Sequence, residues 1–294
     1  MQNSPWSYVA RFAASEGYIY LKQTPPALAL EAKIIHFLRE QFHAPVAEVI
    51  ASHDTLHCFL MHDGGPSLRS LLKKSFDEAL LQRAFDQFIV LQIRVANHID
   101  SFTQMSVPDW RMEAFPALYQ ELLSHQPFLI ADGVSKEDLK TLERLHPRVA
   151  DLSQQLADYA IPSTLVQPDF NDNNTLVNEN TQAITIIDLG EIAIAHPFFS
   201  LLNGLHQIKK HHAPAEDVYY RIQERCLNHF LIFESKENVL KAFNLACQLF
   251  PIYGAIAGYR LKIACDPSKF IGPFSNQGKP GLELKEWIKL SRAN

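Results

Sequence analysis

The sequence predicts an α+β protein with two lobes, a small one built on an antiparallel sheet and a larger one that is mostly helical. Three observations lead to this prediction. Strand-like apolar runs dominate residues 1–63, a glycine-containing turn follows at residues 64–66, and helical periodicity prevails over residues 67–294. We therefore expect a small lobe, a hinge and a helical lobe with these boundaries.

The small lobe is predicted to begin with a β-hairpin and a helix. Strand-like runs at residues 8–12 and 18–22 flank a polar turn around Glu16. Pro25 and Pro26 follow, and proline favours the first turn of a helix. The next apolar residues fall on one face of that helix, at Leu28, Ala32, Ile35 and Leu38.

Two further strands are expected to complete the small lobe. Residues 46–50 and 56–61 are strand-like, and a short polar turn joins them. Residues 62–66 read His-Asp-Gly-Gly-Pro, a composition typical of turns. This turn is expected to close the small lobe.

The rest of the chain is predicted to be mainly helical. Residues 76–102 form a long amphipathic pattern. Ser135 and Asp138 resemble a capping box, which predicts a helix from there to about residue 159. Helical patterns resume at Pro197 and continue to the end.

Composition and charge favour a soluble, cytoplasmic protein. The chain is 47% hydrophobic and 20% charged, and its net charge of −5 argues against a nucleic-acid groove. The four cysteines include no C-x-x-C pair, which indicates reduced thiols. The N-terminus lacks the pattern of a signal peptide, and the most apolar stretch, residues 245–259, is too short and broken to span a bilayer. We expect neither nucleic-acid nor membrane binding.

An Asn/Asp-rich segment between two short apolar runs carries the chemistry. Residues 163–166 and 183–187 are predicted strands; Asp169 and Asn174 follow the first, and Asp188 ends the second. Phosphoryl transfer needs a carboxylate that accepts the hydroxyl proton and oxygen ligands that hold Mg²⁺ on nucleotide phosphates. Kinase-like proteins supply these groups in this order. The pattern predicts Asp169 as the base and Asn174 and Asp188 as metal ligands.

Other interpretations of the same residues stay open at this point. The Asp169–Asn174 spacing alone is weak, because Asp and Asn are common in surface turns. Paired carboxylates at Asp169 and Asp188 would also suit an unrelated hydrolase that needs neither metal nor nucleotide. Asn171 and Asp172 are expected only to shape the loop. Glu191 is left between a role at the metal or substrate site and capping of the next segment.

The segment from Leu165 to Glu191 resembles the catalytic loop and metal strand of the aminoglycoside phosphotransferase/choline kinase family. That family has H-x-D-x-x-x-x-N followed by I-D-[WLF], and here the residues read Gln167-Pro-Asp169, Asn174 and Ile187-Asp188-Leu. The resemblance extends over most of the chain. It implies a protein-kinase-like two-lobe fold and ATP-dependent, Mg²⁺-dependent transfer of the γ-phosphate to a hydroxyl of an unidentified small molecule.

The same resemblance assigns the nucleotide side of the site. It implies that Lys22 contacts the phosphates, that Glu31 holds Lys22 by an ion pair, and that Met61, His62 and Asp63 lie beside the adenine. Without the resemblance, we would interpret Lys22 as an exposed lysine on an edge strand and Glu31 as an exposed glutamate on a helix.

Two departures from the family pattern support a second hypothesis. Gln167 stands where the family has histidine. Only six residues precede the strand that starts near Ser7, and no glycine occurs before Gly17, so the first strand and phosphate loop are expected to be missing or abbreviated. The alternative is therefore a degenerate kinase that serves as a binding or interaction module.

Overall fold

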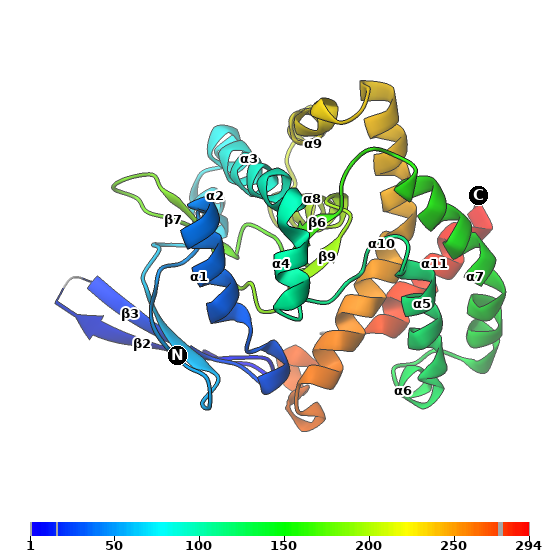
Figure 1. The fold of residues 1–294 in the computed structure, drawn as a ribbon, viewed down its shortest axis with the longest axis horizontal. Coiled ribbons are helices and arrows are strands. Elements are labelled where there is room, and N and C mark those ends of the chain that lie inside the picture. The colour runs from blue at the N-terminus through cyan, green and yellow to red at the C-terminus, as the bar shows by residue number, and fades with distance from the viewer. Residues whose placement is uncertain (1, 16, 276–278, 294) are drawn as a thin grey trace.

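The computed structural model describes residues 2–15, 17–275 and 279–293. It has two lobes: a small one with an antiparallel sheet and one α-helix, and a larger, mostly helical one (Figure 1). The α+β, two-lobe architecture is therefore confirmed. The division at residues 64–66 stays a prediction.

The sheet of the small lobe has five strands in the order β1-β2-β3-β5-β4, all antiparallel to their neighbours. Helix α1 (Glu31–Phe42) connects the third strand of the chain, β3, to the fourth, β4. The strands are β1 (Gln2–Asn3), β2 (Tyr8–Ala14), β3 (Gly17–Gln23), β4 (Val49–His53) and β5 (Cys58–His62).

The hairpin of β2 and β3 is confirmed, although Glu16 of its predicted turn lies outside the described residues. The helix begins later than expected, at Glu31, because Pro26–Leu28 form a separate 3₁₀ turn. Strand β4 also begins three residues late. Val46 instead bridges to Ile186 of the large lobe, so it is not available to the sheet.

The first strand of the sheet is abbreviated rather than missing. In β1, Gln2 and Asn3 pair with Val9 and Tyr8. The turn that follows is tight, since the Ser4 amide donates to the Ser7 carbonyl at 2.9 Å and the Ser7 amide donates to Ser4 Oγ at 3.0 Å. This short connection agrees with the expectation that the first strand and the phosphate loop are missing or abbreviated.

The residues between the lobes pack closely on the large lobe. Gly65 has a φ of 97°, and a Cβ there would lie 2.3 Å from the Val177 carbonyl oxygen. Both the positive φ and this close contact therefore require glycine. The Val177 amide also donates to the Pro66 carbonyl at 2.9 Å. The connection is thus fixed against the strand that contains Val177.

Helices form most of the large lobe. The predicted helix at residues 76–102 divides into two at a 3₁₀ turn, Ala96–His98. The predicted capping box is present: the Asp138 amide donates to Ser135 Oγ, and the Ser135 amide donates to the Asp138 carboxylate. The helices are α2 (Leu68–Lys74), α3 (Glu78–Val95), α4 (Ile99–Gln104), α5 (Phe115–Ser124), α6 (Gln126–Ala131), α7 (Lys136–Ala157), α8 (Phe198–His212), α9 (Glu216–Asn228), α10 (Lys236–Ala264) and α11 (Pro280–Ala293).

Helix α10 is the long central helix of this lobe and packs against α11, α7, α8 and α5 (Figure 1). By length and composition alone it could cross a membrane: its most apolar window has a mean hydropathy of 1.3. However, 56% of that window is buried inside the molecule. Core helices of soluble proteins meet the same criteria.

Two small sheets hold the Asn/Asp-rich segment. The predicted strands at residues 163–166 and 183–187 exist, but they do not pair with each other. Each pairs with a strand that the sequence did not reveal: β6 (Thr164–Val166) with β9 (Ala193–Ala195), and β7 (Thr175–Val177) with β8 (Ile184–Ile186). The loops after β6 and β8 lie next to each other, since the Ile187 amide donates to the Asn174 carbonyl at 3.0 Å.

Candidate active site

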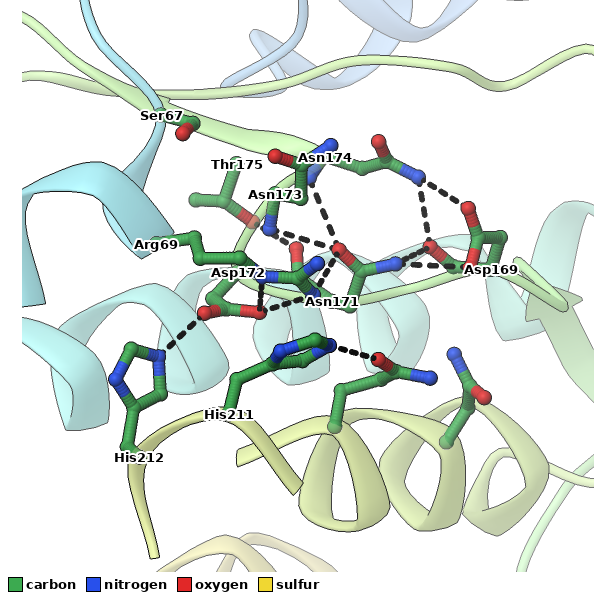
Figure 2. Close-up of polar contacts among 12 residues, drawn as sticks. Ser67, Arg69, Asp169, Asn171, Asp172, Asn173, Asn174, Thr175, His211 and His212 are labelled. Carbon is green, nitrogen blue, oxygen red and sulfur yellow. Dashed lines mark hydrogen bonds and ion pairs between the residues drawn. The ribbon is translucent and has the colours of Figure 1, made fainter. Parts of the chain in front are cut away.

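The loop after β6 is fixed by its own side chains. Asn174 Nδ2 donates to Asp169 Oδ2 at 2.8 Å, and Asn171 Nδ2 donates to Asp169 Oδ1 at 2.8 Å (Figure 2). Both amide groups also donate to the Asp169 main-chain carbonyl, at 2.9 and 2.8 Å. These bonds fix the carboxylate of Asp169 in one orientation.

The environment of Asp169 suits a base that works near neutral pH. Burial and the negative charge of Asp188 raise the pKa of Asp169 to about 6, although hydrogen bonds from Asn174 and Asn171 oppose the rise. A general base is most effective when its pKa lies close to the working pH. The carboxylate can therefore both hold and release a proton under ordinary conditions.

Lys22 lies between two carboxylates. Its Nζ is 2.6 Å from Glu31 Oε2 and 2.5 Å from Asp188 Oδ1. Lys22 is only 5% exposed and Glu31 only 2%, so the interpretation of both as exposed surface residues is wrong. Burial alone would lower the pKa of Lys22, but Asp188 and Glu31 raise it above its usual value, so the lysine stays charged.

The backbone of Asp188 has an unusual conformation that its neighbours hold in place. Its φ is 66°, in the left-handed region. Gln167 Nε2 donates to the carbonyls of Ile187 and Asp188, each at 2.9 Å. The amide of the next residue, Leu189, donates to Glu31 Oε1 at 3.1 Å.

Gln167 is itself fixed in the core. Ser200 Oγ accepts a hydrogen bond from the Gln167 amide at 2.8 Å and donates to the Gln167 carbonyl at 3.1 Å. A chain of contacts thus runs from α8 through Gln167 to the carbonyls at Asp188. Gln167 thus links the loop after β6 to the residues that follow β8.

All eight predicted site residues line one cavity between the lobes, with a volume of about 330 Å³. Sequence reasoning missed Trp6 and Ser7, which line the cavity from the turn after β1. No periodicity or motif distinguishes these two residues. The predicted residues on the cavity are Lys22, Glu31, Met61, His62, Asp63, Asp169, Asn174 and Asp188.

The predicted metal ligands fit a hard divalent cation. Asn174 turns its Nδ2 toward Asp169, which leaves its side-chain carbonyl oxygen able to act as a metal ligand (Figure 2). The Asp188 side chain is 31% exposed and lines the cavity. Mg²⁺ prefers such oxygen ligands and is commonly held by one or two protein groups together with phosphates.

A second buried ion cluster supports the loop from its other side. The Asp172 carboxylate accepts from Arg69 Nη2 at 2.7 Å and lies 2.6 Å from His212 Nε2 (Figure 2). Burial would raise the pKa of Asp172, but the contacts with Arg69 and His212 lower it below its usual value. These contacts tie the loop to α2 and α8, which agrees with the expected loop-shaping role of Asp172.

A second cavity, of about 280 Å³, adjoins the first. Trp6 and Asp169 line both. Glu191, whose role the sequence left open, lines the second cavity; burial and the charges of Asp188 and Asp169 raise its pKa to about 8. Asp169 therefore lies where a group in one cavity can meet a group in the other.

This arrangement of a small sheet lobe, a helical lobe and a catalytic loop between them is that of a kinase-like phosphotransferase. The chain belongs to the phosphotransferase enzyme family (APH), whose model matches residues 2–222. This confirms the resemblance found in the sequence. A search of curated proteins gives no match.

Solved structures with the same fold agree with this assignment. The ethanolamine kinase of Plasmodium vivax is 10% identical with a TM-score of 0.63, over 96% of this chain and 82% of that one. The amicoumacin kinase hAmiN, in complex with AMP-PNP, Ca²⁺ and Ami, is 12% identical with a TM-score of 0.59, over 100% and 87%. The gentamicin–APH(2")-IIa complex is 16% identical with a TM-score of 0.58, over 95% and 89%. At these identities the similarity establishes the fold alone.

Proposed function

We propose that the chain transfers the γ-phosphate of ATP to a hydroxyl group of a small molecule. The observation that carries this proposal is the position of Asp169. It lies at the junction of two cavities, one lined by the Lys22–Glu31–Asp188 cluster and the other open to a second ligand. A donor and an acceptor bound in the two cavities would meet at this carboxylate.

Each residue has a distinct part in the proposed reaction. Lys22 holds the nucleotide phosphates, Glu31 orients Lys22, and backbone groups of residues 61–63 contact the adenine. The acceptor oxygen forms a bond to the γ-phosphorus while the bond from that phosphorus to the β–γ bridging oxygen breaks. ADP leaves, and the hydroxyl proton passes to Asp169.

Asn174 and Asp188 would hold Mg²⁺ through their side-chain oxygens. The bound metal neutralises charge on the nucleotide phosphates. The free carbonyl oxygen of Asn174 and the partly exposed Asp188 carboxylate support this assignment.

The decisive experiment compares two aspartate-to-asparagine variants. ADP formation from ATP is measured with a panel of small alcohols for the wild type, for Asp169→Asn and for Asp151→Asn, an exposed site on α7. We expect Asp169→Asn to lose roughly 10²–10⁴-fold in rate, as for removal of a general base, while Asp151→Asn keeps the wild-type rate.

The same experiment separates the enzyme from a degenerate kinase. A folded Asp169→Asn protein with the wild-type rate would contradict the role of Asp169. A folded wild type that binds ATP but forms no ADP with any alcohol would favour the binding-module hypothesis. The hydrogen bonds from Gln167 to the carbonyls of Ile187 and Asp188 support the enzyme, since they supply the link that the missing histidine would make.

A further inference from the structure

The short turn after β1 presents one large aromatic side chain, Trp6, on a backbone that can move little. Pro5, directly before Trp6, restricts the backbone of the turn. Hydrogen bonds join Ser4 and Ser7 across it, among them one from Ser4 Oγ to the Ser7 carbonyl at 3.0 Å. Both serines are buried. The direction in which the turn carries Trp6 is therefore well defined.

The large lobe holds the Trp6 side chain from the other side of the cleft. The indole meets Phe274 edge-on, with ring centroids 5.4 Å apart, and its centroid lies 6.4 Å from that of Phe270. Aromatic rings attract each other at these separations. The end of α10 also meets the 3₁₀ turn Pro26–Leu28 here (Figure 1). Trp6 packs on a small apolar cluster, separate from the main core, that contains Leu28, Leu261, Ala264, Cys265 and Phe270.

Trp6 lies where the two cavities at the loop after β6 meet. The cavities, of about 330 and 280 Å³, share the lining residues Trp6 and Asp169. Among the described residues that line the second cavity, Trp6 alone comes from the small lobe, and the others follow from Pro168 onward. The indole and the Asp169 carboxylate therefore border the place where the proposed transfer of phosphate occurs.

Water is a competing acceptor at such a junction. In hydrolysis, a water oxygen forms a bond to the γ-phosphorus while the bond from that phosphorus to the β–γ bridging oxygen breaks. The products are ADP and inorganic phosphate, and the water proton passes to Asp169 as an alcohol proton would. Closing an active site against water prevents this kind of side reaction. An indole suits that task because it is large and mostly apolar.

We propose that Trp6, held by Phe270 and Phe274, closes the junction of the two cavities against water, so that the γ-phosphate passes to a bound alcohol. Trp6 sets the choice between two acceptors and takes no part in the bond changes. The inference rests on the proposed phosphotransfer. Phe270 and Phe274 lie beyond residues 2–222, which the family model matches, so membership of the family does not define this contact.

Release of inorganic phosphate from ATP and Mg²⁺, with no alcohol present, measures the access of water. The rate at saturating ATP is compared for wild type, Trp6→Ala, Trp6→Phe and Phe274→Ala. We expect Trp6→Ala and Phe274→Ala to raise kcat by about 2–10-fold, the size of one aromatic contact, whether or not KM for ATP changes. Trp6→Phe keeps an aromatic ring and should stay closer to the wild-type rate.

Phe12 supplies a matched control. It is an exposed aromatic residue of the same lobe, on β2, and it lines neither cavity. Phe12→Ala should release phosphate at the wild-type rate. An unchanged or lower kcat in both Trp6→Ala and Phe274→Ala would overturn the inference, and so would an equal rise in Phe12→Ala.

Quenching of tryptophan fluorescence by acrylamide tests the contact without any transfer of phosphate. Trp110 and Trp287 are buried whereas Trp6 is half-buried, so acrylamide reaches Trp6 most readily. Subtracting the signal of the Trp6→Phe protein isolates the quenching of Trp6. We expect Phe274→Ala to increase this quenching and Phe12→Ala to leave it unchanged. Unchanged quenching in Phe274→Ala would reject the contact.

The two measurements together separate failure of this inference from failure of the proposed function. Increased quenching in Phe274→Ala, in proteins that form no ADP with water or with any alcohol, would support the contact and reject the phosphotransfer. Formation of ADP with an alcohol by wild type, together with unchanged phosphate release in the Trp6 and Phe274 variants, would support the phosphotransfer and reject the role of Trp6.

Discussion

Two buried ion clusters flank the loop after β6. They differ in their ratio of carboxylates to basic groups and in their exposure to a cavity. In the first, Lys22 meets two carboxylates, Glu31 and Asp188, and the Asp188 side chain is 31% exposed on a cavity. In the second, the single carboxylate of Asp172 lies between Arg69 and His212. Its carboxylate is 0% exposed, and neither cavity at the catalytic loop includes it.

The difference indicates what each cluster is for. An excess of carboxylate at an open cavity is suited to a cation that arrives with a ligand. A carboxylate whose two oxygens each contact a basic side chain has no oxygen free for a further ligand. Removing one partner of such a buried ion pair lowers the stability of the fold strongly. We infer that the first cluster serves ligand binding and that the second holds the loop in shape.

The largest expected effect comes from the enclosed cluster. Asp172→Asn should lower the free energy of unfolding by about 3–5 kcal/mol, because Arg69 loses its buried counter-charge. Urea denaturation measures the change. Asp169→Asn is the matched control: it makes the same substitution three residues earlier. Burial already raises the pKa of Asp169 to about 6, so neutralising it relieves a cost of burial, but the new amide can accept only one of the two bonds from Asn171 and Asn174; the loss of stability should therefore be smaller, about 0.5–1.5 kcal/mol. Equal losses in both variants would contradict the distinction.

A smaller effect is expected at the link between the loop and the open cluster. Gln167→Ala removes both hydrogen bonds to the carbonyls of Ile187 and Asp188. The loss should lower the free energy of unfolding by about 1–3 kcal/mol and weaken Mg²⁺-dependent ATP binding. Gln167→His restores a donor at this position and should recover part of the binding. Unchanged ATP affinity in Gln167→Ala would show that Asp188 needs no such support.

The fold, and the meeting of Asp169, Asn174 and Asp188 at one cavity, could be predicted because their signals are local. Asp169, Asn174 and Asp188 lie within one segment, and the two short apolar runs beside them mark strands. The Arg69–Asp172–His212 cluster could not be predicted, since 103 residues separate Arg69 from Asp172 and 40 separate Asp172 from His212.

The second cavity, which Glu283 and Gly254 line, was beyond sequence reasoning for a related reason. Glu283 and Gly254 lie on different helices and carry no motif, so only the packing of α11 against α10 brings them together. Glu191 was recognised as a candidate, but the sequence could not separate a ligand contact from a helix cap.

An effect confined to acidic pH concerns a buried group that, unlike both clusters, has no counter-charge among the described residues. His196 is buried, its Nε2 lacks a hydrogen-bond partner among the described residues, and burial lowers its pKa from 6.5 to about 3. Below pH 6.5 the unfolded chain therefore takes up a proton that the folded protein refuses. Stability should fall as the pH falls from 6.5 toward 3, by up to about 1.4 kcal/mol per pH unit.

A non-titrating variant checks this contribution. His196→Gln should lose less stability than wild type between pH 6.5 and pH 5, as measured by urea denaturation at each pH. Parallel pH curves for the two proteins would contradict the assignment to His196.

The most direct test of the central claim is calorimetric titration of ATP, with and without Mg²⁺, into wild type and Asp188→Asn. Asparagine tolerates the left-handed backbone at position 188, so the variant changes charge and not conformation. We predict binding to wild type that requires Mg²⁺ and that weakens at least about tenfold in Asp188→Asn, as expected when a contact to a charged group is lost. The same affinity without Mg²⁺ and in the variant, or no binding at millimolar ATP, would contradict a working nucleotide and metal site.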